Sequence, residues 1–126
     1  MVSSIQPIIV TRDLDRLLVF YQSLFSATET LRQPPDGPIF YLGLRIGESE
    51  LGLVADSGVD VDAAQRILLS IGVDNVDGML ELVEPAGGQL LGPPNDMPWG
   101  QRVAHIKDPD GNAVNLTQTI QLTQAR

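Results

Sequence analysis

Apolar residues recur along the first half of the chain with two different spacings. Between residues 13 and 25 they return every three or four positions, at Leu14, Leu17, Leu18, Tyr21, Leu24 and Phe25. This spacing predicts an amphipathic helix, and Asp13 or Thr11 can cap its first turn. Short runs rich in β-branched and aromatic residues flank the helix and are expected to form strands. These runs cover residues 5–10, 27–32, 39–45 and 50–55.

Turn-forming residues separate the strands. The Pro-Pro-Asp-Gly-Pro stretch at 34–38 predicts a loop, and Gly47-Glu48 predicts a tight turn between the last two strands. The first half is therefore predicted to follow the order β-α-β-β-β. Phe20 and Tyr21 lie in the helical stripe, so we expect them in the core between the helix and the sheet.

The second half of the chain repeats this order, with Asn75 at the place that Asp13 has in the first half. Strands are expected over 66–71, 89–91, 101–107 and 112–118, a helix over 76–84, and a loop over 93–98. Met79, Leu80 and Val83 form the predicted inward side of that helix. Because a proline has no backbone N–H, the helix is expected to end early or distort at Pro85.

A self-similar pair of this kind restricts the fold class sharply. We predict an α+β fold of two tandem βαβββ modules, whose curved mixed sheets form around a cleft. The 126 residues fit a single domain. Within that domain, module 1 is expected at about 1–56, a linker at 57–63, module 2 at about 64–120 and a tail at 121–126.

Two strings of residues resemble the signatures of a known family. Residues 10–21 (Val-Thr-Arg-Asp-Leu-Asp-Arg-Leu-Leu-Val-Phe-Tyr) resemble the opening signature of the vicinal oxygen chelate superfamily. Residues 98–102 (Pro-Trp-Gly-Gln-Arg) and 108–112 (Asp-Pro-Asp-Gly-Asn) resemble its closing signature. That superfamily includes glyoxalase I, extradiol dioxygenases and bleomycin-resistance proteins. The opening match departs from the pattern because two residues separate Val10 from Asp13 and because Leu17 replaces a small residue. The 108–112 stretch is also plain turn chemistry, which is our preferred interpretation of it.

The resemblance implies four metal-ligand positions, one from each of four strands. They fall on Gln6, Gly52, Leu68 and Asn115. Gly52 and Leu68 have no donor atom, and two neutral amides are poor ligands for divalent transition metals. Glu50 could replace Gly52, because a shift of two residues keeps the strand face. Even so, a site of Gln6, Glu50 and Asn115 would hold one carboxylate and no histidine. We therefore expect no metal and no other cofactor.

Several side chains are candidates for contact with a ligand in the cleft. By alternation Ile8 shares the face of Gln6, and only one of Phe40 and Tyr41 can face inward. Trp99 can stack on a flat or cationic ligand, or cover the core edge or a dimer interface. His105 is the sole histidine and the best candidate for acid–base work, although a ligand-contacting or structural role is favoured. We assign no catalytic residue. The candidate ligand-binding set is Gln6, Ile8, Tyr41, Gly52, Leu68, Trp99, His105 and Asn115.

Composition narrows the partners and the compartment. The chain has 16 acidic and 8 basic residues, a net charge of −8 and a pI of about 4.3, so its surface should repel nucleic acid. It has no cysteine, and no apolar stretch approaches the ~18 residues that a membrane span needs. No secretory signal is evident after Met1. We expect a cytoplasmic protein without nucleic-acid or membrane partners.

Three functions remain open on this evidence. The leading hypothesis is a binding protein for a small molecule, such as an antibiotic or another cationic or aromatic ligand, like the bleomycin-resistance branch. The resemblance also implies a homodimer. The second hypothesis is a lyase, isomerase or dioxygenase with a degenerate or nonstandard metal site, or one that uses His105. The third is an accessory module with a vestigial cleft.

Overall fold

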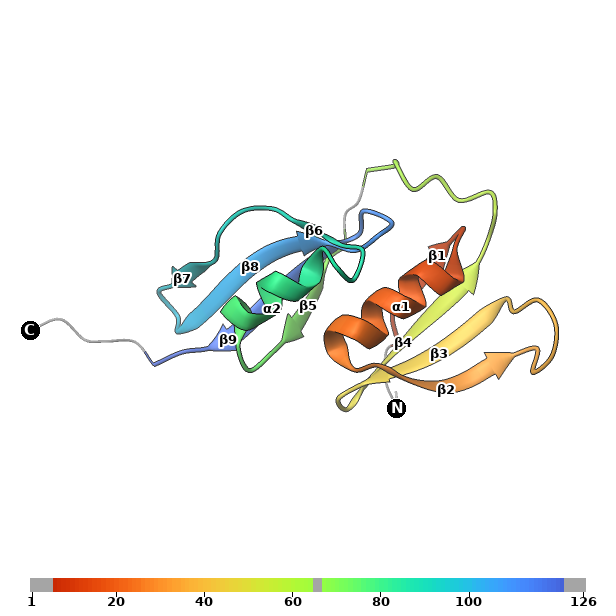
Figure 1. Ribbon diagram of the computed structural model, residues 1–126, viewed down its shortest axis with the longest axis horizontal. Coiled ribbons are helices and arrows are strands. Elements are labelled where there is room, and N and C mark those ends of the chain that lie inside the picture. Colours follow the sequence, from red (N-terminus) through yellow and green to blue (C-terminus); the bar gives the residue numbers. More distant parts are fainter. Residues whose placement is uncertain (1–5, 65–66, 122–126) are drawn as a thin grey trace, which may run out of the picture. The chain divides into compact units, whose positions relative to one another are not determined.

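The computed structural model describes residues 6–64 and 67–121 of the chain. The chain divides into two units, Met1–Val61 and Asp62–Arg126, and each unit packs one helix on one sheet (Figure 1). The first unit follows the order of elements that the sequence predicts, and the second unit follows it with one additional strand. The expected α+β class with two helices and mixed sheets is therefore confirmed.

The first unit contains a four-stranded mixed sheet in the order β1-β4-β3-β2. Strand β1 is parallel to β4, and the other neighbours are antiparallel. The turn between β3 and β4 falls at Gly47-Glu48, as predicted. Its elements are β1 (Ile8–Thr11), α1 (Leu14–Phe25), β2 (Thr28–Gln33), β3 (Tyr41–Ile46) and β4 (Ser49–Ala55).

Both residues that could cap the first helix take part in its start. The Asp13 side chain accepts a hydrogen bond from the Arg16 backbone N–H at 3.1 Å, while the Thr11 hydroxyl oxygen accepts one from the Asp13 N–H at 3.0 Å. The helix ends at Ser26, which adopts a left-handed conformation with φ of 55°. Phe20 and Tyr21 are fully buried, which confirms their place in the core.

The second unit contains a five-stranded sheet in which β5, β9, β8 and β6 follow one another and β7 also pairs with β8. Strand β5 is parallel to β9, and the other pairs are antiparallel. Its elements are β5 (Leu69–Gly72), α2 (Val76–Val83), β6 (Gln89–Leu90), β7 (Asn95–Met97), β8 (Gln101–Lys107) and β9 (Ala113–Thr119).

Two sequence expectations for this sheet need correction. The loop expected over 93–98 contains β7, whose three residues pair in register with Val103, Arg102 and Gln101 of β8. Its Asn-Asp-Met sequence has no strand pattern, so β7 depends on backbone pairing with β8 rather than on apolar alternation. The strand expected over 66–71 begins only at Leu69; Ile67 and Leu68 precede it, and Arg66 lies outside the described residues.

Helix α2 ends where Pro85 led us to expect it to end. Its last residue is Val83, and Pro85 lies in the following turn. The predicted inward side was only partly right, because Val83 is fully buried while Met79 and Leu80 are half-buried. Val76, seven residues before Val83, is also fully buried, so the contact line runs through these two valines and leaves Met79 and Leu80 at its sides.

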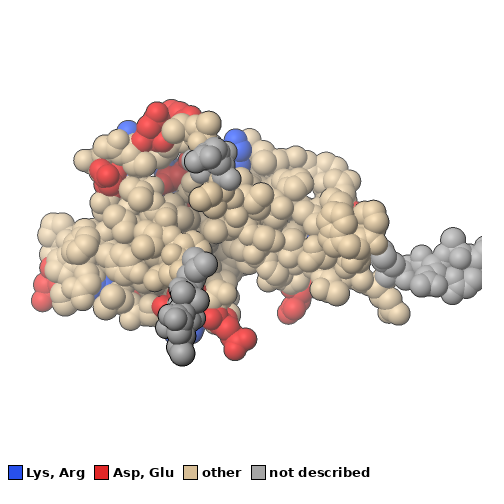
Figure 2. Space-filling view, turned by 180° about the vertical axis from the view of Figure 1, so that it is seen from behind, with Lys and Arg blue, Asp and Glu red and all other residues tan. Residues whose placement is uncertain are grey.

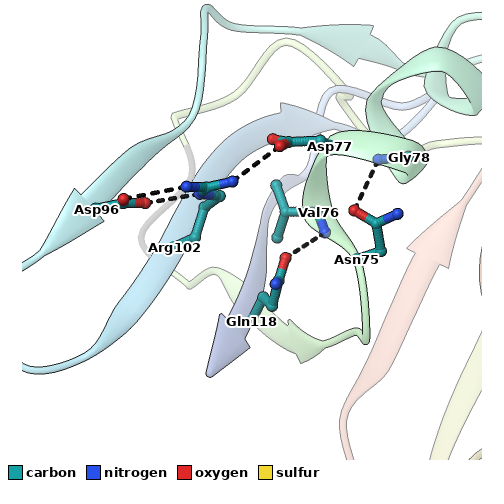
Figure 3. Close-up of polar contacts among 7 residues, drawn as sticks. All are labelled: Asn75, Val76, Asp77, Gly78, Asp96, Arg102 and Gln118. Atoms are coloured by element: carbon teal, nitrogen blue, oxygen red, sulfur yellow. Dashed lines mark hydrogen bonds and ion pairs between the residues drawn. The ribbon is translucent and has the colours of Figure 1, made fainter. Parts of the chain in front are cut away.

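Side chains from the sheet hold the start of α2 (Figure 3). Asn75 caps the helix by accepting a hydrogen bond from the Gly78 N–H at 3.2 Å, and Gln118 of β9 accepts one from the Val76 N–H at 2.8 Å. Arg102 of β8 donates two hydrogen bonds to Asp96 of β7, at 2.7 and 3.1 Å, and one to Asp77 of α2, at 2.8 Å. One guanidinium thus connects α2, β7 and β8.

Candidate functional site

Each sheet has one face covered by its helix and one face without a helix. In the first unit, Leu42, Leu44, Leu51 and Leu53 are buried on the side of α1. Strand register places the alternate residues on the other side, which we call the first helix-free face. Figure 2 views the molecule from behind, and there each unit shows mainly uncharged surface. The first helix-free face comprises Gln6, Ile8, Val10, Tyr41, Gly43, Arg45, Glu50, Gly52 and Val54.

Tyr41 lies across two glycines on this face. Gly43 and Gly52 are direct neighbours on β3 and β4. A Cβ atom on Gly52 would lie 3.0 Å from the Tyr41 hydroxyl oxygen and 3.1 Å from both its Cε1 atom and Cγ1 of Ile8. A Cβ atom on Gly43 would lie 3.6 Å from the Tyr41 Cε2 atom. The ring therefore occupies the space that a side chain at position 52 would need.

The position of Tyr41 answers a question that the sequence left open. Tyr41 is the aromatic residue on the helix-free face, while Phe40 lies before β3 and is 59% exposed. The Gln6 side-chain amide donates a hydrogen bond to the Tyr41 hydroxyl oxygen at 3.0 Å. Two residues that the sequence placed in the same candidate site are thus in contact, although no sequence signal linked them.

Glu50, the alternative metal ligand, is engaged elsewhere. Its carboxylate lies 3.7 Å from the Arg45 guanidinium on the neighbouring strand. Register places Glu50 on the face of Gly52, as the period of two residues predicted. Both partners are about half exposed, so solvent screens this ion pair and its contribution to stability is small.

The second helix-free face lies opposite α2. Val114, Leu116, Ala104 and Ile106 are buried on the helix side, and the alternate residues of β5, β8 and β9 form the other side. Leu68 precedes β5 and is 50% exposed, with an aliphatic side chain that cannot ligate a metal. The second helix-free face comprises Ser70, Gly72, Val103, His105, Lys107, Ala113, Asn115 and Thr117.

His105 and Asn115 form the polar pair of this face. They are direct neighbours across β8 and β9, and the His105 Nδ1 atom lies 2.6 Å from the Asn115 Oδ1 atom. Ser70 of β5 is the register partner of Asn115 on the other edge of β9. The sequence proposed His105 and Asn115 separately, and the antiparallel register of the hairpin brings them together.

The Asp-Pro-Asp-Gly-Asn stretch forms the turn between β8 and β9. The buried Asp108 carboxylate accepts hydrogen bonds from the backbone N–H groups of Asp110 and Asn112, both at 2.9 Å, and from the Asn112 side-chain amide at 2.8 Å. Gly111 has a φ of +86°, which suits glycine. These bonds hold the turn and confirm the interpretation of this stretch as turn chemistry.

Trp99 lies in the turn between β7 and β8 and is 69% exposed. Its indole N–H donates a hydrogen bond to the Gln101 side-chain oxygen at 2.9 Å, which orients the ring. The sequence did not identify Gln101 as this partner, because no sequence pattern predicts a side-chain hydrogen bond between residues i and i+2 in a turn of this kind. The exposed ring leaves its faces accessible.

The four implied ligand positions do not fit a metal ion. Gly52 and Leu68 offer no donor, Gln6 is bonded to Tyr41, and Asn115 is bonded to His105. Within residues 6–64 and 67–121, no group of three or more His, Cys, Asp or Glu side chains could hold a metal. The donor set therefore disagrees with the metal chemistry that the resemblance implies.

Comparison with known proteins gives one family. The model of the Glyoxalase/Bleomycin resistance protein/Dioxygenase superfamily matches residues 4–116. A protein named as a glyoxylase, CFP32, from Mycobacterium bovis and Mycobacterium tuberculosis, is 44% identical over 48 residues. That match covers 38% of this chain and only 18% of the length of each curated relative.

Solved structures share the fold over nearly the whole chain. A superfamily enzyme from Burkholderia phytofirmans PsJN has a TM-score of 0.78 at 23% identity, covering 91% of this chain and 97% of its own. The bleomycin resistance determinant of transposon Tn5 has a TM-score of 0.69 at 22% identity, covering 94% and 98%. The fosfomycin resistance protein FosX from Mesorhizobium loti has a TM-score of 0.71 at 18% identity, covering 94% and 93%. At these identities the likeness is one of fold.

Neither helix in the described ranges, 6–64 and 67–121, has the length and apolar character that a membrane crossing requires.

Proposed function

Because the chain belongs to the Glyoxalase/Bleomycin resistance protein/Dioxygenase superfamily, we propose that it binds a small molecule on its helix-free faces without a bound metal ion. The observation that carries this proposal is that the four implied metal-ligand positions do not offer a suitable set of donor atoms. Two of them lack donor atoms, and the two amides already bond Tyr41 and His105. A metal would gain only neutral oxygen ligands from these amides, and the Asn115 oxygen is already bonded to His105.

The residues around Tyr41 support an aromatic or cationic ligand. The Tyr41 ring lies beside Ile8, which is 52% exposed, and Val10, which is 42% exposed, belongs to the same face. Such a surface suits a flat apolar group, since aromatic rings stack on one another and aliphatic side chains pack against them. The net charge of −8 favours a cation over an anion at a distance.

The first test is a ligand screen followed by thermal unfolding and Trp99 fluorescence. Bleomycin and fosfomycin are the first compounds to test, because two of the structural relatives are named as resistance proteins for these antibiotics. A ligand at 100 times its Kd stabilises the native state by about 2.7 kcal/mol, which is a readily measured rise in Tm. We expect the cationic glycopeptide bleomycin to raise the Tm more than the small anion fosfomycin. No shift with either compound or with a broad panel of aromatic cations would favour the vestigial accessory module.

A pair of variants locates the ligand. Tyr41→Leu removes the ring that lies on Gly52, whereas Phe40→Leu removes an exposed aromatic residue outside the helix-free face. We expect the first change to weaken binding about tenfold or more and the second to leave it unchanged. Equal effects of both changes would place the ligand elsewhere.

The second test is metal analysis of protein purified without chelator. We expect well under one equivalent of nickel, zinc, iron or manganese, and no Tm rise when these ions are added to protein stripped with EDTA. A stoichiometric, tightly held metal would instead support the enzyme hypothesis with a nonstandard site.

A further inference from the structure

The contact between His105 and Asn115 decides which imidazole nitrogen carries the proton. An amide oxygen only accepts hydrogen bonds, so at 2.6 Å from Asn115 Oδ1 the His105 Nδ1 atom must be the donor. A neutral imidazole has one N–H group, and its other nitrogen then holds a lone pair. In neutral His105 that nitrogen is Nε2.

The surroundings of His105 leave this nitrogen accessible and without a carboxylate partner in the sheet. His105 is exposed. On the described strand positions of the second helix-free face, the charged neighbour is Lys107, two residues along β8. On the other side of β8, the backbone N–H of Leu91 bonds the His105 carbonyl oxygen at 3.1 Å, and residues 91–94 (Leu-Gly-Pro-Pro) carry no titratable group.

We propose that His105 is a metal-independent general base, and that Asn115 is its positioning residue. The substrate class is a small planar molecule with an acidic C–H bond, bound on the second helix-free face. The activity goes beyond ligand binding and rests on the proposed function only in that a helix-free face binds a small molecule. A base of this kind needs a lone pair in a defined direction, and the contact with Asn115 supplies this direction by fixing the tautomer of His105.

A probe reaction makes the step explicit. In 5-nitrobenzisoxazole, His105 Nε2 takes the proton from C3. The electron pair of that C–H bond completes the C≡N bond of a nitrile, the ring N–O bond breaks, and its electron pair stays on oxygen as a coloured phenolate. The imidazolium then returns its proton to water. No oxidant, reductant or metal takes part, so the assay can be run in EDTA.

The expected result is a rate well above that of a free imidazole. At equal concentration and pH, we expect the protein to exceed 4-methylimidazole at least about tenfold, because a positioned base contributes more than a diffusing one. His105→Ala should fall to the buffer rate while its affinity for the substrate, measured by equilibrium binding, stays unchanged, whereas failure of the binding site itself would abolish that affinity. A wild-type rate equal to that of 4-methylimidazole would overturn the proposal.

Variants of Asn115 separate positioning from a merely structural role. Asn115→Leu removes the acceptor and should lower kcat about tenfold, while Asn115→Asp keeps an acceptor oxygen and should restore it. Asn95→Leu makes the same chemical change at an exposed asparagine of β7 and should leave kcat unchanged. Equal losses in the Leu and Asp variants of Asn115 would contradict the positioning role.

The tautomer can be observed without any substrate. Since His105 is the only histidine, nitrogen-15 NMR shows a single imidazole, and we expect its Nδ1 to be protonated and its Nε2 to be bare. The Asn115→Leu variant should lose this preference. A wild-type protein with the proton on Nε2 would overturn the proposal whatever the kinetics show.

Discussion

Gly52 illustrates, at the scale of one residue, how the first helix-free face obtains its shape. Alternation along β4 predicted the face to which position 52 belongs, and the register confirms it. What the strand pattern did not contain is the Tyr41 ring above this glycine, with its hydroxyl bonded to Gln6. The Tyr41 ring can lie there because the glycine at position 52 has no side chain.

Gly52→Ala should destabilise the protein and displace Tyr41. The added Cβ atom would lie 3.0 to 3.1 Å from the Tyr41 ring and Ile8, and overpacking of this kind costs about 1–3 kcal/mol. Gly72→Ala is the matched control, since its Cβ atom would find only the Thr117 hydroxyl at 4.0 Å. We expect that change to stabilise the strand by about 0.5–1 kcal/mol. Urea unfolding measures both, and a loss of equal size in both variants would refute the overpacking at Gly52.

Asp108→Ala should weaken the turn between β8 and β9. The buried carboxylate accepts three hydrogen bonds from Asp110 and Asn112, and their loss should lower the free energy of unfolding by about 2–4 kcal/mol. Asp36→Ala, in the exposed 34–38 loop, serves as the control and should change it by less than about 0.5 kcal/mol. Chemical denaturation measures the free energy of unfolding of both variants. Similar losses in the two variants would argue against a stabilising role of the hydrogen bonds to Asp108.

At the scale of elements, side chains of the sheet complete the start of α2. The helix spans eight residues, and such short helices depend on tertiary contacts rather than on their own propensity. Gln118 and Arg102 come from β9 and β8, and Asp96 comes from a strand that the sequence did not predict. The sequence placed Asn75 at the position equivalent to Asp13 and the helix end before Pro85, and the structure has a cap and a helix end there, since both are local effects.

Arg102→Gln should lower the Tm at neutral pH and lose this effect in acid. Hydrogen bonds from the Arg102 guanidinium hold the pKa of Asp96 below its ordinary value of 3.8. A carboxyl whose pKa is depressed by folding stabilises the fold above its unfolded pKa and loses that contribution as the pH falls through the folded pKa. The Tm difference between the wild-type protein and Arg102→Gln should therefore reach its full size above the unfolded pKa of Asp96 and disappear below its folded pKa.

Salt and a second ion pair provide the controls for this prediction. Asp96 is exposed, so added salt should reduce the Tm difference at neutral pH. Arg32→Gln breaks the bond to Glu29 within a single strand and links no separate elements, so its effect should be smaller. A Tm difference that persists unchanged below the titration range of Asp96 would mean that Arg102 acts through packing alone.

At the scale of the whole molecule, charge and exposed apolar residues limit what the protein can associate with. The net charge of −8 opposes nucleic acid and favours cations. Several large apolar side chains are exposed among the described residues, and those of Ile8, Val19, Phe40, Ile67 and Trp99 exceed half exposure. Each of these side chains could contribute apolar area to a surface of association.

We predict that the chain forms a homodimer. Light scattering after size-exclusion chromatography should give twice the chain mass of 13.6 kDa at micromolar concentration. Association through apolar surface should resist added salt, whereas association through ion pairs should weaken with it. A mass of one chain at every concentration tested would show that the exposed apolar residues serve another purpose.

The sequence by itself determined the order of all elements except β7, both helix starts, the end of α2, the turn chemistry at 108–112 and the absence of donor atoms at Gly52 and Leu68. These features follow from neighbours along the chain, through periodicity, capping and turn preference. Only the tertiary structure placed Tyr41 over Gly52, paired His105 with Asn115 and joined α2 to β7 through Arg102. These contacts depend on strand register and on side chains far apart in the sequence, and neither is encoded in any local pattern.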